Sequence, residues 1–161
     1  MAIKVGDRIP KATLKRLTPE GIKDIHTDEF FKGRKVVLFS VPGAFTPTCS
    51  AKHLPGFVEK AEEIKAKGVS EIVCISVNDA FVMDSWGKDR AVGNKVTLLA
   101  DGNAEFSRAL GLEMDGSSYG MGIRGQRFSA LVEDGVVKTL HVEAPGKFEV
   151  SKADVILGDL K

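Results

Sequence analysis

The sequence predicts an α/β fold with a central mixed β-sheet that is flanked by helices on both faces. In the middle of the chain, apolar runs of strand length alternate with amphipathic helical patterns, which is typical of parallel strands joined by helices. Two strand patterns at 128–133 and 136–142 follow late in the chain and meet at Asp134-Gly135, a strong hairpin signal. This hairpin adds antiparallel pairing to a parallel centre, so the sheet is expected to be mixed.

An extended arm, a hairpin and a helical turn are expected before the centre of the sheet. In order, they comprise residues 3–9, 12–17 with 21–26, and 27–31. The turn sequence Pro19-Glu20-Gly21 would close the hairpin, and Thr27 would cap the helical turn.

Three apolar runs are expected to form the centre of the sheet. They comprise residues 36–41, 71–77 and 96–100, and their continuous apolar character fits strands buried on both faces. The remaining elements are a helix carrying residues 81–86, helices over 104–110 and 153–160, and a glycine-rich loop over 116–125. Asn78 or Asp79 would cap the first of these helices, and Ser151 would cap the last.

Length and composition limit the classes of protein that the chain can belong to. The 161 residues are expected to form one domain, 1–161. The formal net charge is +1 and no lysine- or arginine-rich run is present, which argues against nucleic acid or an anionic membrane as partner. No apolar run approaches the ~20 residues of a membrane span, and residues 1–10 lack targeting features, so a cytoplasmic location is expected.

The chain has only two cysteines, Cys49 and Cys74, and three histidines. This low number does not suggest a secreted disulfide framework, and the spacing does not match a zinc site. The cysteines are therefore a reactive thiol, a redox pair or core residues.

Cys49 lies where a strand passes into a helix. The strand 36–41 is followed by Thr46, a good N-cap, and Pro47, a good first helical residue, so Cys49 falls in the first turn. Backbone N–H groups without intrahelical partners and the positive end of the helix dipole favour a thiolate there. One helix end stabilises an anion by only about 0.3–1 kcal/mol, so a basic residue is also expected near Cys49.

Arg124 and Arg127 are the candidates for this basic residue. Arg127 is the better placed, because it stands directly before the strand at 128–133 and after the glycine-rich loop. The glycines of that loop match neither the dinucleotide-binding nor the P-loop spacing, so the loop is interpreted as flexible and not as a phosphate site.

Pro55 is expected to interrupt the helix that carries Cys49. An interior proline removes one hydrogen bond and clashes with the preceding turn. The sequence therefore predicts a short first turn with Cys49, a kink, and a longer helix that restarts near Pro55 and ends at Gly68. Such a turn could unwind while the rest of the helix stays folded.

Two further residues have alternative interpretations. Cys74 lies in the middle of a strand, where buried cysteines are common, and it could reach Cys49 only if the Cys49 turn unwound. His53 follows Cys49 by four residues and could be the base of a cysteine hydrolase. A surface or structural histidine is favoured, because the base in such enzymes normally comes from a distant segment.

The pattern Pro42-x-x-x-Thr46-x-x-Cys49 resembles the active-site signature of the peroxiredoxins. The fuller run Val41-Pro-Gly-Ala-Phe-Thr-Pro-Thr-Cys49-Ser50 is similar to the type II, atypical two-cysteine branch. Residues 76–86 and Arg127-Phe-Ser add to the resemblance, which covers nearly the whole chain.

The resemblance implies a thioredoxin-like fold and the reduction of hydrogen peroxide and organic hydroperoxides without a metal, flavin or haem. It implies that Cys49 is the peroxidatic cysteine and becomes a sulfenic acid, and that the Thr46 hydroxyl hydrogen-bonds the peroxide. It also implies that Pro42 shields the site and that Arg127 holds the thiolate and the peroxide oxygens. Members of the family commonly form homodimers.

The resemblance leaves the regeneration of Cys49 open. Some relatives have a cysteine that matches Cys74, and others have a resolving cysteine near the C-terminus, where this chain offers only Ser151. Either Cys74 forms a disulfide with Cys49, or glutathione, glutaredoxin or thioredoxin attacks the sulfenic acid directly. The alternative function is a non-enzymatic thiol redox sensor or interaction protein.

Overall fold

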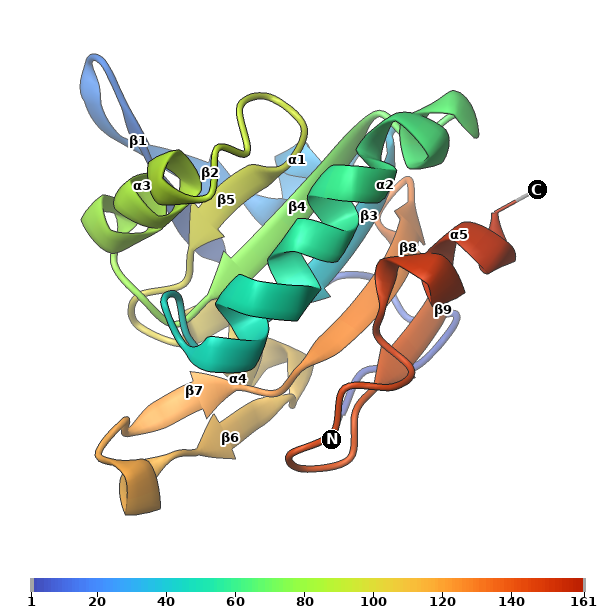
Figure 1. Ribbon diagram of the computed structural model, residues 1–161. Helices are drawn as coiled ribbons and strands as arrows, with labels where there is room; N and C mark the ends of the chain where they lie inside the picture. Colours follow the sequence, from blue (N-terminus) through green and yellow to red (C-terminus); the bar gives the residue numbers. More distant parts are fainter. Residues whose placement is uncertain (1, 161) are drawn as a thin grey trace.

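The computed structural model describes residues 2–160 and is built on a seven-stranded mixed sheet (Figure 1). Its strands are β1 (Thr13–Thr18), β2 (Gly21–His26), β3 (Lys35–Ser40), β4 (Glu71–Ser76), β5 (Thr97–Ala100), β8 (Phe128–Glu133) and β9 (Val136–Val142). They lie in the order β2-β1-β5-β4-β3-β8-β9. The central strands β5, β4 and β3 are parallel, and the strands on either side pair antiparallel.

Helices cover both faces of this sheet, which confirms the predicted fold class. They are α1 (Thr27–Phe30), α2 (Leu54–Ala66), α3 (Ala80–Asp89), α4 (Glu105–Leu110) and α5 (Ala153–Asp159). One core cluster lies between the sheet and the helices α2, α3 and α5, and the other lies beneath α1, α4 and the N-terminal arm. Figure 1 shows α2 crossing one face of the sheet with α5 beside it.

The continuous apolar character of β3 and β4 follows from burial on both faces. Phe39 and Cys74 point to the cluster under α2, whereas Leu38 and Val73 point to the opposite cluster. All four are buried. Parallel strands covered by helices on both sides have this pattern, so β3 and β4 could be identified from the sequence.

The segment expected to be a flexible glycine-rich loop is partly ordered, and this expectation was wrong. It contains β7 (Ile123–Gly125), which pairs with β6 (Glu113–Asp115) in a separate two-stranded ribbon, and a 3₁₀ turn at Ser117–Tyr119. Gly120 and Gly122 have positive φ values of 70° and 68°, which L side chains rarely adopt, and they allow the chain to reverse. Because the ribbon stands apart from the main sheet, its strands lack the alternation that identifies a strand.

Thr27 and Asn78 do not serve as the helix caps that the sequence predicts, and neither do Thr46 and Ser151. The hydroxyl of Thr27 does not cap α1 but donates to the carbonyl of Pro10 (2.7 Å) and accepts from the N–H of Ala12 (2.8 Å), which fastens the arm to the sheet. Asp79 caps α3 as predicted by accepting from the N–H of Val82 at 2.8 Å. Asn78 instead accepts from the N–H of Ala44 at 3.0 Å.

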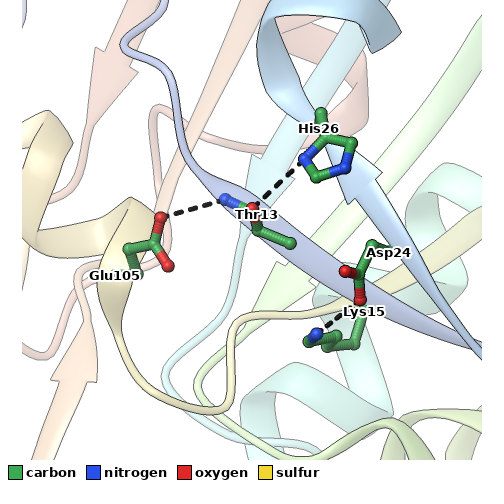
Figure 2. A network of polar contacts seen from close by, with 5 residues as sticks. All are labelled: Thr13, Lys15, Asp24, His26 and Glu105. Carbon is green, nitrogen blue, oxygen red and sulfur yellow. Dashed lines mark hydrogen bonds and ion pairs between the residues drawn. The ribbon is translucent and has the colours of Figure 1, made fainter.

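A polar network fastens the first hairpin to α4 (Figure 2). The N–H of Thr13 donates to Glu105 Oε2 at 3.0 Å, and its hydroxyl lies 3.3 Å from His26 Nδ1. Lys15 and Asp24 form an ion pair across the hairpin. These contacts are exposed, so each contributes little to stability.

Within residues 2–160, no helix has the length and apolar character that crossing a membrane requires.

Candidate active site

The sheet register brings the two halves of the candidate site together. Ser40, the last residue of β3, pairs with Phe128, the first residue of β8, in antiparallel register. The chain leaving β3 toward Cys49 therefore lies beside the chain that enters β8 from Arg127. Arg127 Nη2 donates to Cys49 Sγ at 3.1 Å. The basic neighbour expected from the sequence is thus Arg127.

Cys49 is fully buried and begins a π-helical turn, Cys49–His53, which continues directly into α2. The N–H of Leu54 donates to the carbonyl of Cys49, five residues earlier. Pro55, next in the chain, has no N–H to offer to the carbonyl of Ala51. The short turn with Cys49 and the longer helix that restarts near Pro55 are therefore found, and the junction between them is a widened, π-helical turn, a form that is frequent at functional sites.

The Thr46 side chain is oriented differently from the prediction. The Ser50 N–H donates to the Thr46 carbonyl at 2.9 Å, so Thr46 does stand at the start of the helix. Its hydroxyl donates to the carbonyl of Gly43 at 2.6 Å and does not cap the helix. A tight turn through Phe45, with φ at 65°, brings this carbonyl within reach. The hydroxyl oxygen retains lone pairs that can accept a hydrogen bond from a ligand.

Arg124 holds the loop between β3 and Thr46. Arg124, the other arginine candidate, donates through Nη1 to the carbonyl of Pro42 at 3.4 Å and does not contact Cys49. A Cβ on Gly43 would lie 3.0 Å from Thr46 Cγ2 and 3.2 Å from Arg124 Nη1, so a larger residue here would push these side chains aside. Pro42 is half-buried at the end of β3.

His53 is a buried structural residue with 1% of its surface exposed, so the surface alternative was wrong. Its Nδ1 accepts from Arg127 Nη1 at 2.8 Å, and its Nε2 donates to the carbonyl of Ser151 at 3.0 Å. Burial, followed by the charge of Arg127, lowers the pKa of His53 to about 3. Both ring nitrogens are engaged away from Cys49, which does not fit the base of a cysteine hydrolase.

Ser151 belongs to this site and does not cap the last helix. Lys152 occupies the N-cap position of α5, and the Ser151 hydroxyl donates to Glu143 Oε2 at 2.7 Å. Sequence reasoning missed the contacts of His53, Glu143 and Ser151 because they come from separate segments, and no local spacing links them.

Cys74 lies in β4 opposite Phe39, in the same core cluster as Cys49. Both cysteines are free and fully buried. Burial, with a contribution from negative charge at Cys49, raises the pKa of the Cys74 thiol well above its ordinary value. Cys74 is therefore held as a neutral thiol beneath the Cys49 turn.

The fold and this site define a class of protein. A thiol at the start of a helix, fixed by a guanidinium at the carboxyl end of a central parallel strand, is the arrangement of a thiol-based redox protein.

Comparisons with known proteins place the chain within that class. The Redoxin family model matches residues 4–157. The chain is 53% identical over 160 residues to chloroplastic Peroxiredoxin-2E-2 of Oryza sativa subsp. japonica, covering 96% of this chain and 71% of the relative. It is 49% identical over 156 residues to Peroxiredoxin-2B of Arabidopsis thaliana, covering 96% of each.

Solved structures give the same result. A crystal structure of reduced Prx3 from Vibrio vulnificus in complex with hydrogen peroxide has a TM-score of 0.96 and 52% sequence identity, covering 99% of each chain. The chain therefore belongs to the Redoxin family and to the peroxiredoxins within it, which are thiol-dependent peroxidases with the thioredoxin fold. The resemblance identified in the sequence is confirmed.

Proposed function

We propose that this protein reduces hydrogen peroxide and organic hydroperoxides with Cys49 as the attacking thiolate. The observation that carries the proposal is the 3.1 Å contact from Arg127 Nη2 to Cys49 Sγ. A guanidinium stays charged at any physiological pH and can bridge sulfur and oxygen at once. It therefore stabilises both the Cys49 thiolate and the negative charge that passes from the sulfur to the peroxide oxygens.

The reaction balances as a two-electron transfer. The Cys49 sulfur attacks one peroxide oxygen, an S–O bond forms, and the O–O bond breaks with its electron pair leaving on the second oxygen. That oxygen takes a proton and departs as water or alcohol, so the peroxide is reduced and the sulfur is oxidised to a sulfenic acid. Donors fixed along the line of charge movement stabilise the transition state more than the ground state.

Three residues take the remaining roles in this proposal. The Arg127 guanidinium stabilises the negative charge as it moves from sulfur to oxygen. The Thr46 hydroxyl donates to Gly43 at 2.6 Å, which leaves its oxygen to accept the O–H of the peroxide. Half-buried Pro42 shields the sulfur from water.

Cys49→Ser tests the proposal directly. We expect it to abolish peroxide turnover, because a serine hydroxyl is not ionised at neutral pH and cannot form the sulfenic acid. Cys74→Ser is the matched control for the attack on peroxide, measured as the first equivalent of peroxide consumed without reductant, since it changes the other buried thiol and leaves Cys49 and Arg127 in place. Full turnover by Cys49→Ser would refute the proposal. A single equivalent of peroxide consumed by the parent with reductant in excess would indicate a sensor and not an enzyme.

Regeneration is proposed to use glutathione with glutaredoxin, or thioredoxin. Cys74 would contribute a disulfide only if the Cys49–His53 turn unwinds, because both thiols are buried. Comparing Cys74→Ser with the parent under each donor distinguishes the two routes. Equal rates with every donor would exclude an essential resolving role for Cys74.

A cytoplasmic homodimer completes the proposal. Phe45, in the loop after β3, and Phe81, in the first turn of α3, are 49% and 60% exposed. The bond from the Ala44 N–H to Asn78 Oδ1 joins the two segments that carry them. Two exposed aromatic side chains here would suit a second copy of the chain. Two free cysteines fit a reducing compartment. Sedimentation of the parent and of Phe81→Ser tests the dimer, and cell fractionation tests the location.

A further inference from the structure

We propose that His53 is a positioning residue that orients the Arg127 guanidinium on Cys49 and is itself anchored by the loop between Glu143 and Ser151. The proposal rests on the proposed peroxidase function and concerns the same site. It assigns a role to buried polar groups that the reaction with peroxide does not use directly.

The guanidinium of Arg127 is fixed through both of its terminal nitrogens. Nη1 donates to His53 Nδ1 at 2.8 Å, and Nη2 donates to Cys49 Sγ at 3.1 Å. The group is planar and rigid, so an acceptor at one nitrogen determines where the other nitrogen points. Without His53, a half-buried arginine could turn toward water and leave the sulfur.

The tautomer of His53 follows from its two partners. The carbonyl of Ser151 can only accept, so Nε2 carries the proton, and the guanidinium can only donate, so Nδ1 offers a lone pair. Burial and the neighbouring cation lower the pKa of His53 to about 3, so the ring stays neutral at pH 7. A neutral acceptor holds the cation without cancelling its charge, whereas a carboxylate at this position would compete with the sulfur for it.

Aromatic rings fix the plane of the imidazole. The ring centroids of Phe39, Phe57 and Phe148 lie 4.9, 5.6 and 5.0 Å from that of His53. Phe148 also lies beneath the Arg127 guanidinium, with 5.7 Å from Cζ to the ring centroid. The rings of Phe39 and Phe57 come from the core, whereas Phe148 comes from the loop that follows β9.

Glu143 sets the shape of that loop. Its Oε2 accepts the N–H groups of Glu149 (2.7 Å), Val150 (2.9 Å) and Ser151 (2.8 Å), and also the Ser151 hydroxyl. Only 6% of Glu143 is exposed. Burial alone would raise the pKa of Glu143, but these bonds outweigh it and lower the pKa. The carboxylate thereby fixes the Ser151 carbonyl that receives His53.

The contacts form a closed ring around Arg127. The backbone N–H of Glu143 donates to the carbonyl of Arg127 at 3.0 Å, while its carboxylate holds Ser151. Ser151 holds His53, and His53 holds the Arg127 side chain. Both the backbone and the guanidinium of Arg127 are therefore determined by the same loop.

Two substitutions at position 53 separate positioning from packing. His53→Leu keeps an apolar side chain of similar size but removes both polar contacts. His53→Gln can reproduce both contacts, because its carbonyl oxygen accepts and its amide nitrogen donates. The second-order rate of peroxide reduction and the rate of Cys49 alkylation by iodoacetamide at pH 6 are measured for both variants, with circular dichroism as the check of folding.

We expect His53→Leu to slow both rates by about 10–100-fold, the effect of losing a hydrogen bond to a charged group. His53→Gln should restore both rates to within about threefold of the parent, because it restores the same bonds. If folded His53→Leu keeps the parent rates, or if His53→Gln is as slow as His53→Leu, the positioning role is wrong.

A double-mutant cycle keeps the proposal testable whatever the stability of the leucine variant. In an Arg127→Ala background, replacing His53 by Gln or Leu should change the rates by less than about twofold, because the group to be positioned is absent. Glu143→Leu, which removes the acceptor of three backbone N–H groups and of the Ser151 hydroxyl, should slow both rates in the parent background only. If the rate losses caused by the His53 and Arg127 substitutions multiply in the double variants, the proposal is wrong. Failure of the peroxidase function itself would appear separately, as turnover by Cys49→Ser.

Discussion

The guanidinium of Arg127 combines a fixed charge with two directed hydrogen bonds at one residue. It reaches Cys49 Sγ and His53 Nδ1 at the same time, at 3.1 and 2.8 Å. A lysine would bring the same charge but as a point, with a flexible stem and no planar fork. The geometry of the donor, and not only the sign of its charge, therefore decides how well the site stabilises the negative charge that moves from sulfur to oxygen.

Arg127→Lys is predicted to lower the second-order rate with hydrogen peroxide by about 10²-fold, because a misplaced donor loses most of its transition-state stabilisation. Stopped-flow measurement under single-turnover conditions would show this. Arg124→Lys is the matched control, since Arg124 donates to the carbonyls of Met121 and Pro42 and does not contact the sulfur. The second-order rate of Arg124→Lys should fall by less than about tenfold. Equal losses in the two variants would contradict the role given to Arg127.

Single residues differed in how far the sequence could predict them. Arg127 could be found because it stands directly before a buried strand, which fixes its place at the sheet edge. The partnership of His53 with Arg127 could not, because 74 residues separate them and the pairing depends on the tertiary fold. Thr46 was placed correctly at the helix start, but its hydroxyl found a closer acceptor in Gly43.

At the scale of elements, the Cys49 turn is tied to α3 as well as to α2. The indole N–H of Trp86 donates to Ser50 Oγ at 2.9 Å, and both residues are buried. This bond joins the π-helical turn to a helix from a different part of the chain. Any unwinding that exposes Cys49 must therefore break it.

Ser50→Ala is predicted to destabilise the protein by about 1–3 kcal/mol, because it leaves the buried Trp86 N–H without an acceptor. Urea unfolding followed by circular dichroism measures this loss. In the Trp86→Phe background the same change should cost much less, since the unsatisfied donor is gone. A loss that is the same in both backgrounds would mean that the bond contributes nothing specific.

Gly125 connects the β6–β7 ribbon to the segment that carries Arg127. A Cβ here would lie 2.9 Å from Ser107 Oγ and 3.1 Å from Ser40 Oγ. Gly125→Ala should therefore cost about 1–3 kcal/mol in unfolding free energy through overpacking. Gly158 in α5 has nothing within 4 Å of such a Cβ, so Gly158→Ala should stabilise by about 0.5–1 kcal/mol. A thermal melt of both variants gives the two signs, and a stable Gly125→Ala would disprove the close approach.

Strands of the main sheet were predictable because burial requires apolar residues along them, in continuous runs where both faces are buried. The strand 36–41 was expected and Lys35–Ser40 is found, while 136–142 was expected and Val136–Val142 is found. The π-helical turn was not predictable, because it depends on how the carbonyl of Cys49 is satisfied next to Pro55. The ribbon β6–β7 was missed because it has little core face of its own.

For the whole molecule, the site lies where the parallel centre of the sheet meets its antiparallel edge. β3 is the last parallel strand, and β8 runs antiparallel beside it. The carboxyl end of one strand and the amino end of the other therefore meet at the same edge of the sheet. This topology brings Cys49 and Arg127 together and lets the chain after β9 close over them.

Acid should destabilise the whole fold through His53. Its pKa is about 3 in the folded protein and ordinarily 6.5, so between these values the unfolded chain binds a proton that the folded chain does not. Stability is therefore complete above pH 6.5 and falls by about 1.4 kcal/mol per pH unit as the pH drops toward 3. Glu143, whose folded pKa is lowered, adds a loss of the same sign below its ordinary value of 4.5.

Urea unfolding at pH 7.5 and pH 5.0 isolates the contribution of His53, because Glu143 stays ionised in both states over most of this range. The parent should lose about 2 kcal/mol more than His53→Gln between the two pH values, since a glutamine cannot take up the proton. Every other residue is the same in both proteins, so the difference between them reports on position 53 alone. An equal loss in the parent and in His53→Gln would mean that the imidazole is not held neutral in the fold, and the acceptor role of His53 toward Arg127 would lose its electrostatic basis.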